Sequence, residues 1–328
     1  MSQLRLNPLT GRWVAISGSR SGRPASFAPR ALTVESDPTR ACPFCPGNEE
    51  STPPALETYG PGGDWLVRVV LNLFPAFYGE EQMAVTHLGP VWSEAPAGGI
   101  HEILVFSPNH SGTWAGLGDE QAGLVMNAIH DRMRDHSSRS GLRYTQVIVN
   151  FGREAGASLE HPHGQLLAVP FVPGEIVEEV RGFSRFGGGC LLCTTIEAET
   201  SVGHRVVIDH ERVTVVAPYW SGSPYEMLVI PRACEEHLHE AAPRDLAAVG
   251  RAIRDALARL QKLHGDLAYN IVFHTAPFAH DSHFHWHAHL VPKLTTQAGF
   301  ELGTGVMINI VAPEQAAQEL RDIETSTR

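Results

Sequence analysis

The chain has 328 residues, of which 43% are hydrophobic and 19% are charged, and its formal net charge is −11. This acidic balance argues against a nucleic-acid binder, whose surface would be basic, and the chain has no apolar run of about 18 residues that would predict a membrane span. The start, MSQLRLNPLTGRW, lacks the apolar region of a secretory signal, so we expect a cytoplasmic protein.

The first half of the chain contains five predicted strands and one predicted helix. Runs of apolar and β-branched residues that end at Pro or Asn are typical of strands. A 3.6-residue apolar period between Asp119 and Gly141 predicts the helix. The predicted strands are RWVAIS (12–17), WLVRVVLN (65–72), HEILVFSP (101–108), YTQVIVN (144–150) and GQLLAVP (164–170).

The second half repeats this order. A strong helical pattern at 244–265 is flanked by two pairs of predicted strands, VTVVAP (213–218) with YEMLVIPR (225–232), and YNIVFH (269–274) with HAHLVP (287–292). His161 follows Asn150 by eleven residues, and His285 follows His274 by the same number. We therefore predict a tandem duplication of one α+β unit, with an antiparallel sheet and packed helices.

The duplication divides the chain into two predicted halves, residues 1–173 and 174–328. The first contains the HPHGQ motif and the second contains its repeat. The segment GEIVEEVRGFSRFGGGC (174–190) is expected to be the loop that joins them.

Two Cys-x-x-Cys pairs predict metal sites, because such a pair supplies two thiolates at the spacing that zinc requires. Cys42 and Cys45 need two more ligands, and we expect His110 and His161, which lie at strand ends. A disulfide framework is a poor alternative for a cytosolic chain.

The second pair, Cys190 and Cys193, takes His285 as its third ligand by the repeat. For the fourth we prefer Cys234, and His237 remains the alternative. Neither site leaves an open coordination position, so both are expected to be structural. Zinc is expected in both, with iron an alternative in one of them.

We expect His161 to face the first metal site and His163 to face the other way, and we expect Gln165, two residues further on, to share the face of His163. The preceding loop, NFGREAGASLE, contains glycines that let backbone N–H groups approach a phosphate. Arg20 and Arg23 suit phosphate recognition. These residues favour covalent catalysis at phosphorus by His163. The alternative is a polar histidine beside a structural metal.

The chain resembles the galactose-1-phosphate uridylyltransferase family of the histidine-triad superfamily. The resemblance rests on NPLTGRWV, SRSGRP, CPFCPGNE, FSPNHS and HPHGQ in the first half, and on HFHWHAHLVP and FELGTGVMINIVAPEQAA in the second. The segments CLLC and GTGVMIN are more similar to the branch of the family that includes ADP-glucose phosphorylase.

The resemblance implies a double displacement in which UDP-glucose and galactose 1-phosphate exchange a nucleotidyl group through His163. In the ADP-glucose phosphorylase branch, inorganic phosphate is the acceptor. The family also implies a homodimer and zinc in the first site. The implied roles are phosphate binding for Gln165 and Ser158, and substrate binding for Arg20, Arg23, Asn72, Asn150 and Gly156.

Two alternatives stay open. The same histidine could support hydrolysis or phosphorolysis of a nucleotide sugar or a dinucleotide. A zinc-stabilised binding module without catalysis is the alternative outside the enzymes.

Overall fold

The structure is a computed structural model that describes residues 2–18, 41–79, 83–279 and 283–323. The two predicted substrate-binding arginines, Arg20 and Arg23, lie outside these ranges.

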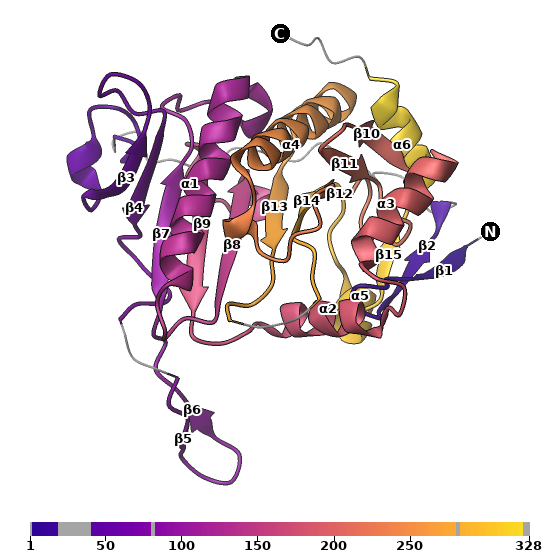
Figure 1. Ribbon diagram of the computed structural model, residues 1–328, viewed down its shortest axis with the longest axis horizontal. Coiled ribbons are helices and arrows are strands. Elements are labelled where there is room, and N and C mark those ends of the chain that lie inside the picture. Colours follow the sequence, from indigo (N-terminus) through magenta and orange to yellow (C-terminus); the bar gives the residue numbers. More distant parts are fainter. Residues whose placement is uncertain (1, 19–40, 80–82, 280–282, 324–328) are drawn as a thin grey trace.

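A ten-stranded sheet runs through the molecule, and all of its strand pairs are antiparallel (Figure 1). One half of the sheet is contributed by the first unit, with strands in the order β8 (Tyr144–Phe151), β9 (His163–Val169), β7 (Ile100–Val105), β4 (Val67–Leu71) and β3 (Ala55–Tyr59). The other half is contributed by the second unit, in the order β13 (Tyr269–His274), β14 (His287–Pro292), β12 (Met227–Pro231), β11 (Val213–Val216) and β10 (Val206–Asp209).

The two halves of the sheet are equivalent in strand order, and they meet where β8 pairs with β13. Asn150 lies opposite Asn270 at this junction, and Ile148 lies opposite Val272. Each half has the same strand order counted outward from the junction. The predicted α+β fold and its duplication are confirmed.

Two long helices, α1 (Asp119–Ser137) and α4 (Pro243–His264), lie side by side across one face of the sheet (Figure 1). Gly250 lets them approach closely, since a Cβ there would lie 2.5 Å from the carbonyl oxygen of Ala122. Leu104, Val149 and Leu166 point from the strands into the core beneath these helices. Because side chains alternate along a strand, the residues between these positions project from the opposite face of the sheet.

The segment from 174 is a helix and not the expected loop. Helix α2 (Gly174–Arg185) has Ile176 and Phe183 buried, seven residues apart and therefore on one side. Gly182 lies against the N-terminal turn, where a Cβ would be only 1.9 Å from the carbonyl oxygen of Leu9. The expectation of a loop over 174–190 was therefore wrong for most of this segment. The Gly-rich stretch 187–189 is irregular, and α3 (Leu191–Val202) begins shortly after it.

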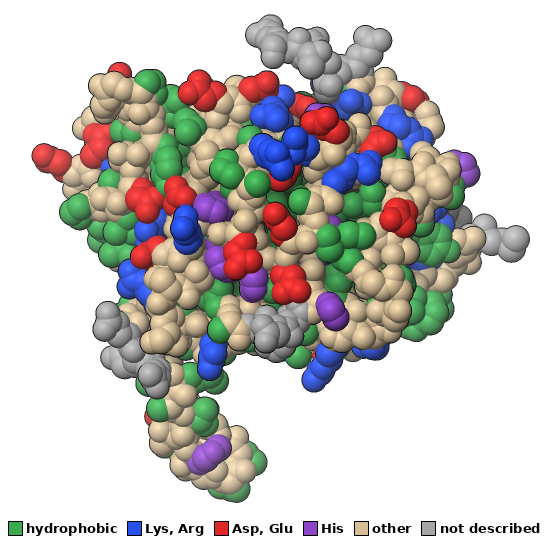
Figure 2. Space-filling view, viewed as in Figure 1, with side chains coloured by type: hydrophobic (Ala, Val, Ile, Leu, Met, Phe, Trp, Pro, Cys, Tyr) green, Lys and Arg blue, Asp and Glu red, His purple; other side chains and the backbone are tan. Residues whose placement is uncertain are grey.

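The remaining elements lie at the periphery. A small sheet joins the N-terminal and C-terminal segments through β1 (Gln3–Leu6), β2 (Trp13–Ile16) and β15 (Met307–Asn309). Two short helices, α5 (Gly299–Thr304) and α6 (Pro313–Arg321), flank β15 in the sequence. The hairpin of β5 (Thr86–His87) and β6 (Ser93–Glu94) protrudes from the body and carries hydrophobic side chains at its surface (Figures 1 and 2).

Within the described ranges, none of the helices combines the length and the apolar character needed to span a bilayer.

Candidate functional site

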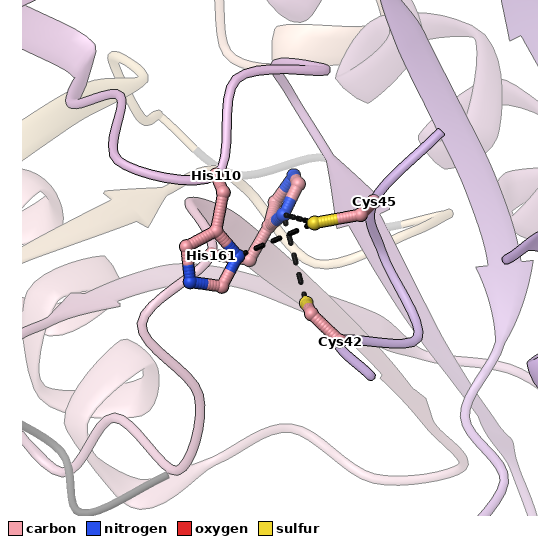
Figure 3. Close-up of side chains that lie close together, drawn as sticks. All are labelled: Cys42, Cys45, His110 and His161. Atoms are coloured by element: carbon pink, nitrogen blue, oxygen red, sulfur yellow. Dashed lines mark hydrogen bonds between the residues drawn. The ribbon is translucent and has the colours of Figure 1, made fainter. Parts of the chain in front are cut away.

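Cys42, Cys45, His110 and His161 converge on one point, although they come from three separate loops (Figure 3). Their ligand atoms all lie within 4.8 Å of one another. The Nδ1 atom of His161 is 3.7 Å from the sulfur of Cys42 and 3.6 Å from that of Cys45, and His110 Nδ1 is 3.3 Å from Cys45. Two thiols and two imidazole nitrogens at these separations suit one tetrahedral metal ion.

The ring of His161 is held in the orientation that a metal ligand needs. Its Nε2 donates a 2.7 Å hydrogen bond to the carbonyl oxygen of Ser107, so Nδ1 carries the lone pair that faces the thiols. Burial lowers the pKa of His161 to about 4, which keeps the ring neutral.

The second cluster has the same design at the corresponding place in the second unit. Cys190 and Cys193, at the start of α3, lie 3.3 and 3.6 Å from His285 Nδ1, and Cys234 completes the group within 4.8 Å. His285 Nε2 donates to the carbonyl oxygen of Pro231 at 2.9 Å. Burial raises the pKa of Cys190, but the interactions with His285, the backbone of Cys193 and Cys234 together outweigh it and lower the pKa to about 6, which favours the thiolate that binds metal.

The alternative ligand of this second site, His237, is not part of the cluster.

His163 begins β9 and is only 5% exposed. Its Nδ1 lies 2.8 Å from the backbone carbonyl oxygen of His161, to which it can only donate. The unprotonated lone pair is therefore on Nε2. Burial lowers the pKa of His163, so the ring is neutral at pH 7 and Nε2 can act as a nucleophile.

The ring of Phe44, from the loop between Cys42 and Cys45, packs at a tilt against this ring with a centroid separation of 5.4 Å. The metal-binding loop therefore also fixes the position of His163.

The predicted phosphate-binding residues surround the same end of β8 and β9. Gln165 lies two residues beyond His163 and on the same face of the strand. Asn150 lies one residue before the end of the neighbouring strand β8, and its Oδ1 accepts a 2.7 Å hydrogen bond from Asn270 of the second unit. Gly156 has a φ of +88°, which favours glycine, and Ser158 is exposed in the same loop.

Asn72 follows β4 on the same side of the first unit. Its Nδ2 lies 3.2 Å from the Nε2 of His101, and this histidine contacts Gln165. Asn72 and Gln165 are thus connected through His101, across neighbouring strands of the sheet.

A third cluster was missed from the sequence. Glu179 of α2 meets His274, His287 and His289, and their ligand atoms also lie within 4.8 Å of one another. Glu179 Oε1 is 2.9 Å from His274 Nδ1, whereas its buried Oε2 has no hydrogen-bond partner among the described residues. An unpaired buried carboxylate oxygen facing three imidazoles fits a cation.

The internal repeat was the signal that could have found these histidines. His274, His287 and His289 occupy the positions in the second unit that Asn150, His163 and Gln165 occupy in the first. The comparison of the two units could not have found Glu179, because this fourth member of the cluster comes from α2, which was expected to be a loop.

Comparisons with known proteins place these features in a family. The model of the galactose-1-phosphate uridyl transferase N-terminal domain matches residues 1–173, and that of the C-terminal domain matches residues 177–327. ADP-glucose phosphorylase of Arabidopsis thaliana is 30% identical over 331 residues, which cover 98% of this chain and 93% of the relative. Galactose-1-phosphate uridylyltransferase of Thermotoga maritima is 28% identical, with 99% of each chain covered.

Solved structures agree with the sequence relatives. The crystal structure of the Arabidopsis thaliana ADP-glucose phosphorylase with bound ADP-glucose superposes with a TM-score of 0.84 at 29% identity, covering 99% of this chain and all of that one. A uridylyltransferase structure gives 0.75 at 26% identity, with 98% of each chain covered. The predicted resemblance is confirmed: the chain belongs to the galactose-1-phosphate uridylyltransferase family.

Proposed function

We propose that this protein is a nucleotidyltransferase that works by double displacement through a covalent intermediate on His163. The observation that carries the proposal is the hydrogen bond from Nδ1 of His163 to the carbonyl oxygen of His161, which leaves the Nε2 lone pair as the nucleophile. Membership of a family whose named members act on nucleotide sugars or sugar phosphates supports it.

In the first step Nε2 attacks the phosphorus that carries the nucleoside. The P–N bond forms, the P–O bond to the sugar phosphate breaks, and sugar 1-phosphate leaves. The imidazole keeps its Nδ1 proton and becomes positively charged, and the carbonyl oxygen of His161 stabilises that charge. In the second step an acceptor phosphate oxygen attacks the same phosphorus, the P–N bond breaks and neutral His163 is restored.

The groups around His163 serve to hold phosphate oxygens. We propose this role for the amide of Gln165 and the hydroxyl of Ser158, with Asn150 and Gly156 shaping the pocket and Asn72 contacting the nucleotide. For Arg20 and Arg23, contact with the nucleotide sugar remains a proposal based on resemblance. Positioned donors of this kind contribute through electrostatic stabilisation of the transferring group.

Two substrate pairs are proposed. UDP-glucose with galactose 1-phosphate is the pair of the uridylyltransferases. ADP-glucose with inorganic phosphate is the second candidate, and the superposition on a structure with bound ADP-glucose favours it.

The test is intact-protein mass spectrometry after incubation with UDP-glucose and, separately, with ADP-glucose, without acceptor. We expect the mass of one nucleoside monophosphate to be added in the wild type and in the control His204→Asn, which changes an exposed histidine outside the site, but not in His163→Asn. The base of the adduct identifies the donor. Release of free nucleoside monophosphate without an acceptor would favour hydrolysis, and an adduct on His163→Asn would contradict the proposal.

We propose zinc in the two cysteine-containing clusters, because thiolate and imidazole ligands suit zinc. Iron stays an alternative in one of these two clusters. It is also a candidate for the cluster of Glu179 and three histidines, whose ligands are harder. Each metal would link segments that are distant in the sequence and would stabilise the fold. Elemental analysis of the purified protein tests the metal content.

We also propose a cytoplasmic homodimer, in line with the family resemblance. None of the five cysteines, all in the described ranges, forms a disulfide, which suits a reducing compartment. Light scattering coupled to size-exclusion chromatography tests the dimer, and a mass of one 35.7 kDa chain would contradict it.

A further inference from the structure

A histidine outside the HPHGQ motif makes direct contact with Gln165. His101 lies on β7, next to β9 in the sheet, and is 7% exposed. Its Nε2 lies 2.9 Å from Gln165 Oε1, and its Nδ1 lies 3.1 Å from the backbone nitrogen of Ala76. Both of its ring nitrogens are therefore occupied.

The backbone of Ala76 decides which nitrogen of His101 carries the proton. A backbone N–H can only donate, so Nδ1 of His101 is the acceptor. A neutral imidazole has one acceptor nitrogen and one N–H, and the proton is consequently on Nε2. The partner of Nε2 in Gln165 must then be the amide oxygen, so the NH₂ group of Gln165 points away from His101.

The ring of His101 is itself held by the segment that follows β4. The Nδ2 of Asn72 lies 3.2 and 3.4 Å from Nε2 and Nδ1 of the ring, and because Nε2 carries the proton, its contact with this NH₂ group is not a hydrogen bond. Asn72 Oδ1 accepts a 2.9 Å hydrogen bond from the backbone of Phe74. The segment 72–76, the imidazole and the amide of Gln165 therefore form one connected chain of contacts.

We propose that His101 is a positioning residue for nucleotidyl transfer and that it acts through Gln165. This inference rests on the proposed function, in which Gln165 binds a phosphate oxygen. With its carbonyl held by His101, Gln165 presents its NH₂ group to the phosphate, where a donor is attractive and a carbonyl would be repulsive. The reversed amide would place NH₂ against the Nε2 proton of His101.

The test compares the rate of nucleotidyl-enzyme formation in a single turnover, with UDP-glucose or ADP-glucose as the donor. His101→Leu removes the donor, and we expect a rate about 10- to 100-fold lower, the range for a hydrogen bond that acts on a charged group. His101→Gln retains an N–H donor and should recover most of the rate. In a Gln165→Leu background, His101→Leu should change the rate by less than about twofold, because its route of action is already lost.

A readout independent of activity is the tautomer of His101, observed by nitrogen-15 NMR of histidine-labelled protein and assigned by the signal lost in His101→Gln. We expect a proton on Nε2, and a proton on Nδ1 would overturn the inference even if His101→Leu does not fold.

The kinetic outcomes separate the two proposals. A full rate in folded His101→Leu, or effects that multiply in the double variant, would overturn the positioning role alone. The absence of any adduct on the wild type would overturn the proposed function, and the positioning role with it.

Discussion

Asn270 allows a quantitative prediction, because it connects the second unit to the loop beside His163. Its Nδ2 donates to Asn150 Oδ1 at 2.7 Å and to the carbonyl oxygen of Ala155 at 2.9 Å. Asn270→Leu removes both hydrogen bonds and keeps a side chain with the same number of heavy atoms. At about 0.5–1.5 kcal/mol for each, the free energy of unfolding should fall by about 1–3 kcal/mol.

The same substitution should weaken substrate binding. Ala155 belongs to the turn that leads to Gly156 and Ser158, so a loose loop no longer holds these residues in place for the phosphate. We expect KM for the nucleotide sugar to rise more than kcat falls in steady-state assays. Urea denaturation measures the loss of stability.

A matched control is Gln146→Leu. Gln146 occupies the position in the first unit that Asn270 occupies in the second, and its Nε2 donates to the carbonyl oxygen of Phe273 at 2.9 Å across the same strand pair. Within the described part of the chain, its side chain makes no hydrogen bond to the loop of Ala155. Both variants should lose stability, but only Asn270→Leu should raise KM. An equal KM in the two variants would refute the reasoning.

Three further predictions concern the metal clusters and helix α2. Cys45→Ser should lower the metal content by one ion per chain and lower the midpoint of thermal unfolding, because the cluster joins loops that are far apart in the sequence. Unchanged metal content by elemental analysis would contradict this prediction. Glu179→Gln should remove the ion of the third cluster while the cysteine clusters keep theirs, as measured by the same analysis. Gly182→Ala should destabilise the protein by about 1–3 kcal/mol or more, because the added Cβ overpacks against Leu9. Gly174→Ala is the control and should not destabilise it, because a Cβ there meets open space. Equal midpoints of thermal unfolding for the two variants would count against this packing.

The strands of the sheet and the two long helices were predictable because the pattern of their apolar residues matches the faces that they bury. Strands β8 and β13 are buried on the side of α1 and α4 and read as apolar, β-branched runs, and the two long helices carry a clear period. The residues of the two cysteine clusters could be grouped for a related reason. Cys-x-x-Cys has a fixed local geometry, and the repeat points to the histidine that each pair requires.

The third cluster could not be assembled in this way. Its histidines are spread over β13 and β14, and its carboxylate comes from α2, whose sequence lies beside the Gly-rich stretch at 187–189. The spacing of Ile176, Val180 and Phe183 was the available sign of a helix, but local spacing does not say which strand a helix covers. The proton on His101 was equally out of reach, because it depends on the backbone of Ala76, which only the folded chain brings to the ring.

The duplication also explains why the proposed chemistry occurs at one of two equivalent positions. Both His163 and His287 donate from Nδ1 to the carbonyl oxygen of the residue two before, at 2.8 Å in each unit. The difference is at Nε2. That of His287 is fully buried, 3.2 Å from His289 Nε2 and 3.7 Å from Glu179, so substrate phosphorus cannot reach it.

In the first unit Gln165 replaces the second histidine, and no described helix brings a carboxylate to His163. The same strand geometry therefore fixes the tautomer of His163 and of His287. The groups around Nε2 then decide whether this atom can act as a nucleophile. An amide held by His101 leaves the lone pair of His163 available for phosphorus, whereas an added carboxylate and histidine make the second position part of a cluster that fits a cation.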